Sequence, residues 1–284
     1  MRQSPTASNI EHLDVTPQSL LLAFLGMHLL WRPIAISGAS IVDVFGWLAV
    51  GPAATRSLLA RMTDRGLLER HKVGRKTYYS LTESGTSLLE NGSKKVWRGV
   101  GDADWDGLWT SVAISVPEDS RHLRHRARSR LNWAGFGTTP SGLWVAPRRH
   151  DVAAILGSDF AEVDLTVMVG RVMPPTTDET LVTSAFDLSE ISTRYTEFIA
   201  RWQDIDIGTS SREFAFGTRI RLQAEWLSIT RTDPLLPTQL LPNAWPAGDA
   251  ERLFRVSDAT LARATVGLES DGIDSIEIRS GDAR

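Results

Sequence analysis

The N-terminal part of the chain shows the apolar pattern of three helices. From Pro17 the run SLLLAFLGMHLLW is almost wholly apolar and indicates a buried helix, and the apolar residues 41–50 indicate a second, shorter one. Gly51 and Pro52 open a third helix, because glycine tolerates the cap conformation and proline is preorganised for the first helical position. Gly66 is the expected end of this third helix.

Two short strands follow these helices. The runs LLERHKV and KTYYSL flank a turn at Gly74 and Arg75, which is the pattern of a β-hairpin. Thr82 is placed to cap a further helix. Three helices followed by a hairpin predict a winged helix-turn-helix over residues 17–97. We expect the polar tail before it, 1–16, to be disordered.

The middle and the end of the chain differ in pattern. Residues 105–180 read as strand, helix, strand, helix, strand, which suggests a ferredoxin-like α+β domain. Residues 185–284 are predicted to be helical, since Tyr195, Phe198 and Trp202 recur with helical spacing. The predicted fold class is therefore α+β, with an N-terminal winged helix-turn-helix, a central ferredoxin-like domain and a helical C-terminal domain.

Composition narrows the class of protein. Hydrophobic residues make up 42% and charged residues 23% of the chain, as in an ordinary globular protein, and there is no cysteine. The lack of cysteine excludes disulfides and thiolate metal sites and fits a reducing cytoplasm. The longest apolar run, from Leu20 to Trp31, is interrupted and too short to span a bilayer. We expect a cytoplasmic protein with neither a signal peptide nor a membrane partner.

Positive charge is concentrated toward the N-terminus. The whole chain has a net charge of -3, yet residues 1–95 hold eleven Lys and Arg against seven Asp and Glu. Residues 50–80 hold seven against two. This density favours a polyanionic partner, double-stranded DNA above all. The alternative is a solvated basic face on an adaptor that binds only proteins.

The third predicted helix and the hairpin supply the candidate DNA contacts. At 100° per residue the apolar side chains of this helix face inward, whereas Arg56, Ser57 and Ala60 face outward. An arginine early in a recognition helix can bond a guanine with two hydrogen bonds, so Arg56 is the candidate for base readout. The small side chains of Ser57 and Ala60 permit a close approach of this helix to DNA. Arg75 and Lys76 lie where a wing would meet the DNA backbone or minor groove.

A second arginine cluster lies in the run RHLRHRARSR. Arg121, Arg124 and Arg128 share one face of the predicted helix and could clamp the phosphates of a nucleotide-tailed ligand, although a solvated helix face explains them as well. His122 and His125 are too weak a signal for a metal site without cysteine or acidic ligands nearby. The sequence shows no phosphate-loop, nucleophile-elbow or zinc-protease motif, so we assign no catalytic residue, metal or cofactor.

Several local motifs, in their order along the chain, resemble those of a known family. They extend from about Gln18 to Leu268 and read SLLLAFLG, TRSLLARM followed by RGLLERHKVGRKTYYSLTESG, WDGLWT, GFGTTPSGLWVAPR, YTEFIARW and DPLLPTQLLPNAWP. Together they make the chain similar to the PaaX family of bacterial transcriptional repressors.

The resemblance implies a homodimer that represses a catabolic operon and leaves its DNA operator when an acyl-coenzyme A thioester binds. It also implies that Arg56 and Arg61, as the paired arginines of the family's recognition helix, contact DNA. The phosphates of such an effector would bind the stripe formed by Arg121, Arg124 and Arg128. The implied central domain is similar to a CRISPR-associated small endoribonuclease.

That likeness also leaves an enzyme as the competing hypothesis. A metal-dependent nuclease would hold its metal on acids of the central domain, for which the candidates are Asp104, Asp106, Glu118 and Asp119. Fold does not imply function, however, and acids near strand ends are common on protein surfaces. We therefore predict a DNA-binding regulator that is not an enzyme.

Overall fold

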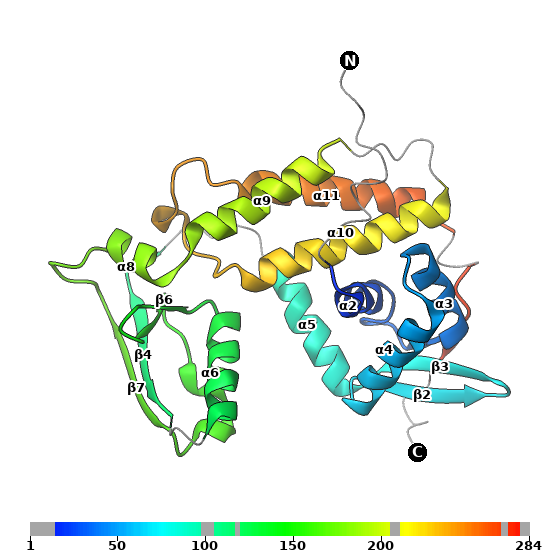
Figure 1. Ribbon diagram of the computed structural model, residues 1–284, viewed down its shortest axis with the longest axis horizontal. Helices are drawn as coiled ribbons and strands as arrows, with labels where there is room; N and C mark the ends of the chain where they lie inside the picture. Colours follow the sequence, from blue (N-terminus) through cyan, green and yellow to red (C-terminus); the bar gives the residue numbers. More distant parts are fainter. Residues whose placement is uncertain (1–14, 98–104, 117–119, 205–210, 268–271, 279–284) are drawn as a thin grey trace. The chain divides into compact units, whose positions relative to one another are not determined.

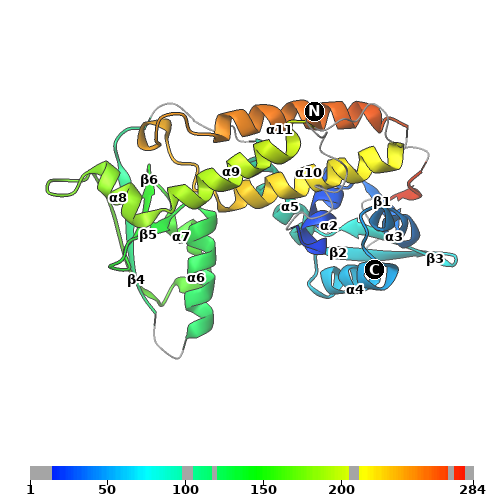
Figure 2. The ribbon, with the colours of Figure 1, turned by 45° about the horizontal axis from the view of Figure 1, so that its top comes forward.

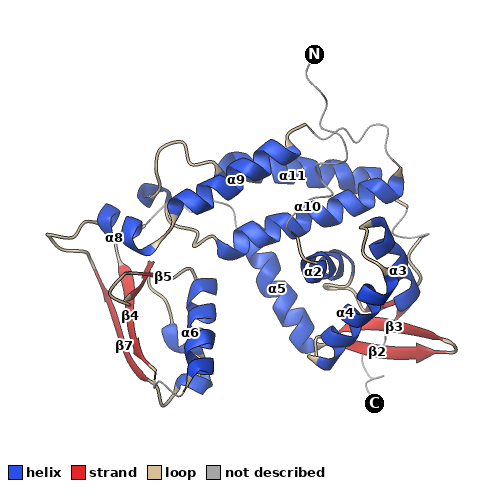
Figure 3. Ribbon diagram, viewed as in Figure 1, coloured by secondary structure: helices blue, strands red, loops and turns tan. Residues whose placement is uncertain are grey.

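The computed structural model describes residues 15–97, 105–116, 120–204, 211–267 and 272–278. Within these ranges the chain is a mixed α+β protein whose strands form two four-stranded antiparallel sheets (Figure 1; Figure 3). Contacts between residues gather into two compact units. The first consists of Met1–Arg98, Phe198–Ser228 and Arg252–Arg284, and the second of Gly99–Glu197 and Ile229–Glu251. Most of the tail predicted to be disordered, up to residue 14, lies outside the described residues.

The first unit begins with two helices and a strand between them. Helix α2 (Pro17–His28) forms where the apolar run predicts it. The second predicted helix begins earlier than expected, as α3 (Gly38–Trp47), because the Ser37 hydroxyl accepts a hydrogen bond from the Ser40 backbone N–H at 3.1 Å and caps the helix. Before this cap lies the strand β1 (Ile34–Ser37), which the apolar pattern does not indicate.

The third predicted helix and the predicted hairpin are confirmed. Helix α4 (Pro52–Asp64) packs beside the strand β2 (Leu68–Val73), which pairs along its whole length with β3 (Lys76–Leu81) (Figure 2). In the two-residue turn between these strands Gly74 has a φ of +60°, which glycine adopts at little cost. Helix α5 (Glu83–Trp97) then follows.

The sheet of the first unit takes its last strand from the C-terminal end of the chain. Its strand order is β2-β3-β1-β8, and β8 (Ser275–Glu277) pairs antiparallel with β1, so that Ile34 lies opposite Glu277. Ile273, just before β8, is buried in the same core as α2, α3 and α4. A strand from the C-terminal part of the chain therefore completes the sheet that carries the hairpin.

Helices from the C-terminal part also pack in the first unit. They are α9 (Leu188–Trp202), α10 (Arg212–Thr232) and α11 (Ala247–Ala264), each of which belongs to this unit over part of its length. Phe216 of α10 stacks on His28 of α2, with ring centroids 5.2 Å apart, and burial lowers the pKa of this histidine to about 3. Trp226 stacks on Phe254 at 4.8 Å. None of the helices in the described ranges is both long and apolar enough to cross a membrane.

The second unit is built on the other sheet, in the strand order β5-β6-β4-β7. Its elements are β4 (Trp109–Ser115), α6 (Arg121–Trp133), β5 (Gly137–Thr138), β6 (Trp144–Pro147), α7 (Val152–Leu156), the 3₁₀ turn Ser158–Phe160, β7 (Asp164–Gly170), α8 (Asp178–Ala185) and the 3₁₀ turn Thr238–Leu240. Successive residues of a strand point to opposite faces. Accordingly Trp144 packs in one core with Leu131 of α6, while Val145 packs in another with Val182 of α8.

Candidate nucleic-acid interface

The outer face of α4 presents the helix residues predicted to contact DNA. Arg56, Ser57, Ala60 and Arg61 are all exposed, whereas Leu58 between them is 2% exposed and belongs to the core of the first unit. The opposite faces of α4 thus have opposite environments, as the helical period requires. The face of α4 that carries the two arginines is therefore exposed to solvent.

The two arginines of this face, Arg56 and Arg61, are not used in ion pairs within the described part of the chain. Arg61 Nη1 lies 3.4 Å from Ser57 Oγ, at the limit of a hydrogen bond. A guanidinium without a carboxylate partner can present its N–H donors to a phosphate or to the edge of a guanine.

The tip of the hairpin is basic and exposed. Val73 lies opposite Lys76 in the register of the two strands, and Gly74 and Arg75 form the turn that joins them. The side chains of Lys72, Arg75 and Lys76 are exposed, and Val73 itself is 51% exposed. Cations on a short, regular hairpin are well placed for phosphate contacts beside a groove.

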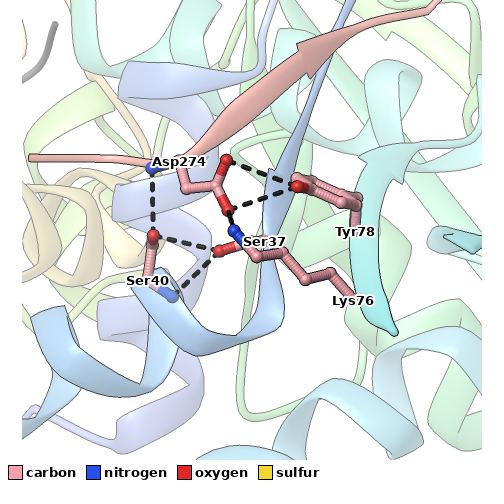
Figure 4. Close-up of polar contacts among 5 residues, drawn as sticks. All are labelled: Ser37, Ser40, Lys76, Tyr78 and Asp274. Carbon is pink, nitrogen blue, oxygen red and sulfur yellow. Dashed lines mark hydrogen bonds and ion pairs between the residues drawn. The ribbon is translucent and has the colours of Figure 1, made fainter. Parts of the chain in front are cut away.

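One cation of this tip has an acidic partner from the far end of the chain. Lys76 Nζ lies 2.9 Å from Asp274 Oδ2, and the Tyr78 hydroxyl lies 3.2 and 3.3 Å from the two oxygens of the same carboxylate (Figure 4). The hydrogen bond to Asp274 raises the pKa of Lys76, and the same bond lowers the pKa of Asp274. The two residues are 198 positions apart, so no local pattern in the sequence points to Asp274.

The second predicted arginine cluster lies on α6. Its stripe is exposed as the helical spacing predicts and consists of Arg121, Arg124 and Arg128. Two other arginines of the same helix are used within the second unit, because Arg126 and Arg130 both pair with Asp159. Arg130 also donates to the Leu156 carbonyl, and its guanidinium carbon lies 5.6 Å from the centre of the Phe160 ring. Part of this cluster therefore joins α6 to the segment after α7.

The described residues hold no group of three His, Asp or Glu side chains placed to bind a metal ion. His122 and His125 are exposed on α6. Among the acids considered for nuclease chemistry, Asp106 accepts a hydrogen bond from the Leu108 backbone N–H at 3.0 Å and so stabilises a turn. The others lie outside the described residues: Asp104, Glu118 and Asp119.

A basic outer helix face followed by a basic hairpin is the arrangement of a DNA-binding module. Family comparison identifies the chain in three successive segments. Residues 16–85 match the PaaX-like protein family, residues 102–182 the central Cas2-like domain of PaaX protein, and residues 186–266 the PaaX-like protein C-terminal domain. The chain belongs to the PaaX family, and the resemblance seen in its sequence motifs is confirmed.

Two individual proteins are similar to the chain over most of its length. Transcriptional repressor PaaX of Escherichia coli (strain K12) is 26% identical over 269 residues, which cover 89% of this chain and 84% of that protein. The solved structure of uncharacterized protein Rv0674 from Mycobacterium tuberculosis has a TM-score of 0.57 and 21% identity, covering 87% of this chain and 95% of that one. The second likeness shows a shared fold.

Proposed function

We propose that this chain is a DNA-binding transcriptional repressor of a catabolic operon, acting in the cytoplasm. Residues 17–97 are its winged helix-turn-helix, with α3 and α4 as the helix pair and the β2–β3 hairpin as the wing. The observation that carries the proposal is the outer face of α4, where Arg56 and Arg61 are exposed with no acidic partner among the described residues. The kinship with a protein named as a transcriptional repressor favours a regulator over a nuclease.

In this proposal α4 enters the major groove and the wing lies against the backbone or minor groove. Arg56, near the start of the helix, reads a base edge. The remaining contacts come from Ser57, Ala60, Arg61, Arg75 and Lys76.

Binding to genomic promoter fragments and to random duplexes, measured over a range of salt concentrations, tests the proposal. We expect preferred fragments and a steep fall of affinity with salt, because each neutralised phosphate releases counterions. Equal affinity for every sequence at every salt concentration would contradict operator binding. Cleavage of labelled RNA or DNA in the presence of Mg²⁺ or Mn²⁺ would favour the nuclease instead.

The proposed division of the rest of the chain is a ferredoxin-like domain over 105–180 and a helical domain over 185–284. The sheet of the second unit has the strand order β5-β6-β4-β7, with α6 between β4 and β5 in the chain and α7 between β6 and β7. Such split βαβ units define the ferredoxin-like fold, which supports the assignment of residues 105–180. The helices α9, α10 and α11 support the assignment of a helical domain over 185–284.

We further propose that the repressor is a homodimer that joins through the edge strand β7. This strand pairs only on the side of β4 within the described sheet, and its centre is apolar, with Val167, Met168 and Val169 exposed by 42%, 57% and 40%. An exposed apolar edge is a template for pairing with a second strand. A two-fold dimer would match half-sites about 10 bp apart or a multiple of it. Sedimentation of Met168→Lys as a monomer would support this contact, and an unchanged dimer would exclude it.

The proposed effector is an acyl-coenzyme A thioester. Its phosphates would be held by the stripe Arg121, Arg124 and Arg128, and its acyl group would need an apolar pocket. The thioester must bind more tightly to the conformation that cannot hold DNA, since equal affinity for both would shift nothing. The chemical class of the effector is tested by measuring the thermal shift of the protein and its release from the operator with acyl-CoAs and, in parallel, with the corresponding free acids. A response to the free acid alone would exclude it.

A further inference from the structure

The C-terminal strand brings a carboxylate to the basic tip of the hairpin. Asp274 precedes β8 and lies beside Lys76, the first residue of β3, at the end of the shared sheet (Figure 4). Both side chains are partly exposed, Lys76 by 63% and Asp274 by 39%. The pair thus lies on the surface that the wing presents.

Backbone contacts hold Asp274 in place independently of its carboxylate. The Asp274 N–H donates to Ser40 Oγ at 3.0 Å (Figure 4). The Ser37 N–H donates to the Asp274 carbonyl at 2.8 Å. On either side the buried Ile273 and the pairing of β8 with β1 fix the segment. A neutral side chain at position 274 should therefore leave the strand where it is.

Lys76 differs from the other cations of the proposed interface because it forms an ion pair within the chain. Arg56, Arg61 and Arg75 form no ion pair with the described residues, whereas the Lys76 ammonium already has a carboxylate at 2.9 Å. A DNA phosphate would have to displace this carboxylate or share the ammonium with it, and the carboxylate also repels the phosphate.

We propose that Asp274 is a positioning residue that holds Lys76 and thereby limits the DNA affinity of the wing. The proposal rests on the proposed function and deepens it, because it assigns the C-terminal strand a direct effect on the interface. Arg75 is then the stronger phosphate contact of the wing, and Lys76 contributes less than Arg75 while the carboxylate holds it.

The experiment uses the full chain and a random-sequence duplex, since phosphate contacts do not depend on sequence. Asp274→Asn should bind roughly threefold or more tightly at low salt, and the slope of log affinity against log salt should steepen by about 0.9, as expected for one added phosphate contact. Glu277→Gln is the matched control, because it removes an equal charge from the exposed face of the same strand without freeing Lys76. It should change affinity far less.

Two further variants separate positioning from general charge. Lys76→Ala should reduce affinity and slope in the native chain by less than Arg75→Ala does, and it should abolish the gain in the Asp274→Asn background. Arg75→Ala should reduce the slope by about 0.9 in either background. Because these two single variants keep Asp274, they test the proposal even where Asp274→Asn fails to fold.

Other results of these experiments would overturn the proposal. An affinity of Asp274→Asn equal to that of Glu277→Gln, or lower than that of the native chain with an unchanged melting temperature, would overturn the proposal. So would a loss on Lys76→Ala in the native chain as large as that on Arg75→Ala. Failure of the native chain to bind any duplex would instead overturn the proposed function itself.

Discussion

Helices α4 and α6 both carry arginines, two on α4 and five on α6, and these side chains have different surroundings. On α4, Arg56 and Arg61 point outward and form no ion pair with the described residues. On α6, Arg126 and Arg130 converge on Asp159. By count of charges α6 is the more basic helix, so it is the positions of the acids that set α4 apart as the candidate for DNA contact.

The difference has a physical consequence for binding. An arginine that already pairs with a carboxylate has had part of its charge neutralised, so a phosphate gains less from approaching it. An unpaired arginine offers both its charge and its full set of donors. The comparison therefore predicts that α4 acts on DNA and that the paired arginines of α6 act on stability.

The largest expected effect is on the α4 side of the comparison. Arg56→Ala should weaken binding to a preferred promoter fragment by about 1 to 3 kcal/mol, the value of a two-bond contact to a base, and should change the melting temperature little. Fluorescence anisotropy titrations on the preferred and on a random duplex measure it. A loss of the same size on both duplexes would reduce Arg56 to a phosphate contact.

A smaller effect, on stability and not on DNA binding, is expected within the second unit. Arg130→Ala removes the ion pair with Asp159 and a donor to the Leu156 carbonyl, and should cost about 1 kcal/mol of the free energy of unfolding, or about 2 to 4 °C in melting temperature. Affinity for DNA should not change. If instead DNA binding falls while the melting temperature holds, the paired arginines of α6 belong to the interface and the comparison fails.

The smallest effect is expected on the exposed stripe of α6. Arg128→Ala should change the free energy of unfolding by less than about 0.5 kcal/mol, because exposed surface positions contribute little. Its affinity for DNA should stay within about twofold of the native value. Operator release by acyl-CoAs is the property that should weaken, and a variant that responds like the native chain would make the stripe a solvated surface.

The elements that the sequence predicts well are those whose signals are local. Gly51 and Pro52 mark the start of α4, Gly74 marks the hairpin turn, and Thr82 caps α5 through its Oγ1, which accepts from the Gly85 N–H at 3.0 Å. Each of these signals lies within a few residues of its effect. The exposure of Arg56 follows from the same local periodicity.

The strands that the sequence does not predict are short and depend on distant partners. β1 has four residues and β8 has three, too few to show an alternating pattern. Their stability comes from pairing with each other and, for β1, with β3. The early start of α3 likewise depends on Ser37, which ends a strand and caps a helix at once.

The sequence by itself determined which cations gather on the outer face of α4 and at the tip of the hairpin, because helical period and turn geometry act over a few residues. Only the tertiary structure decided which of those cations has an acid beside it. Asp274 reaches Lys76 across 198 positions, and Asp159 reaches Arg130 across 29, through packing that no local pattern encodes. Charge is a property of the residue, but neutralisation depends on distance, and distance is set by the fold.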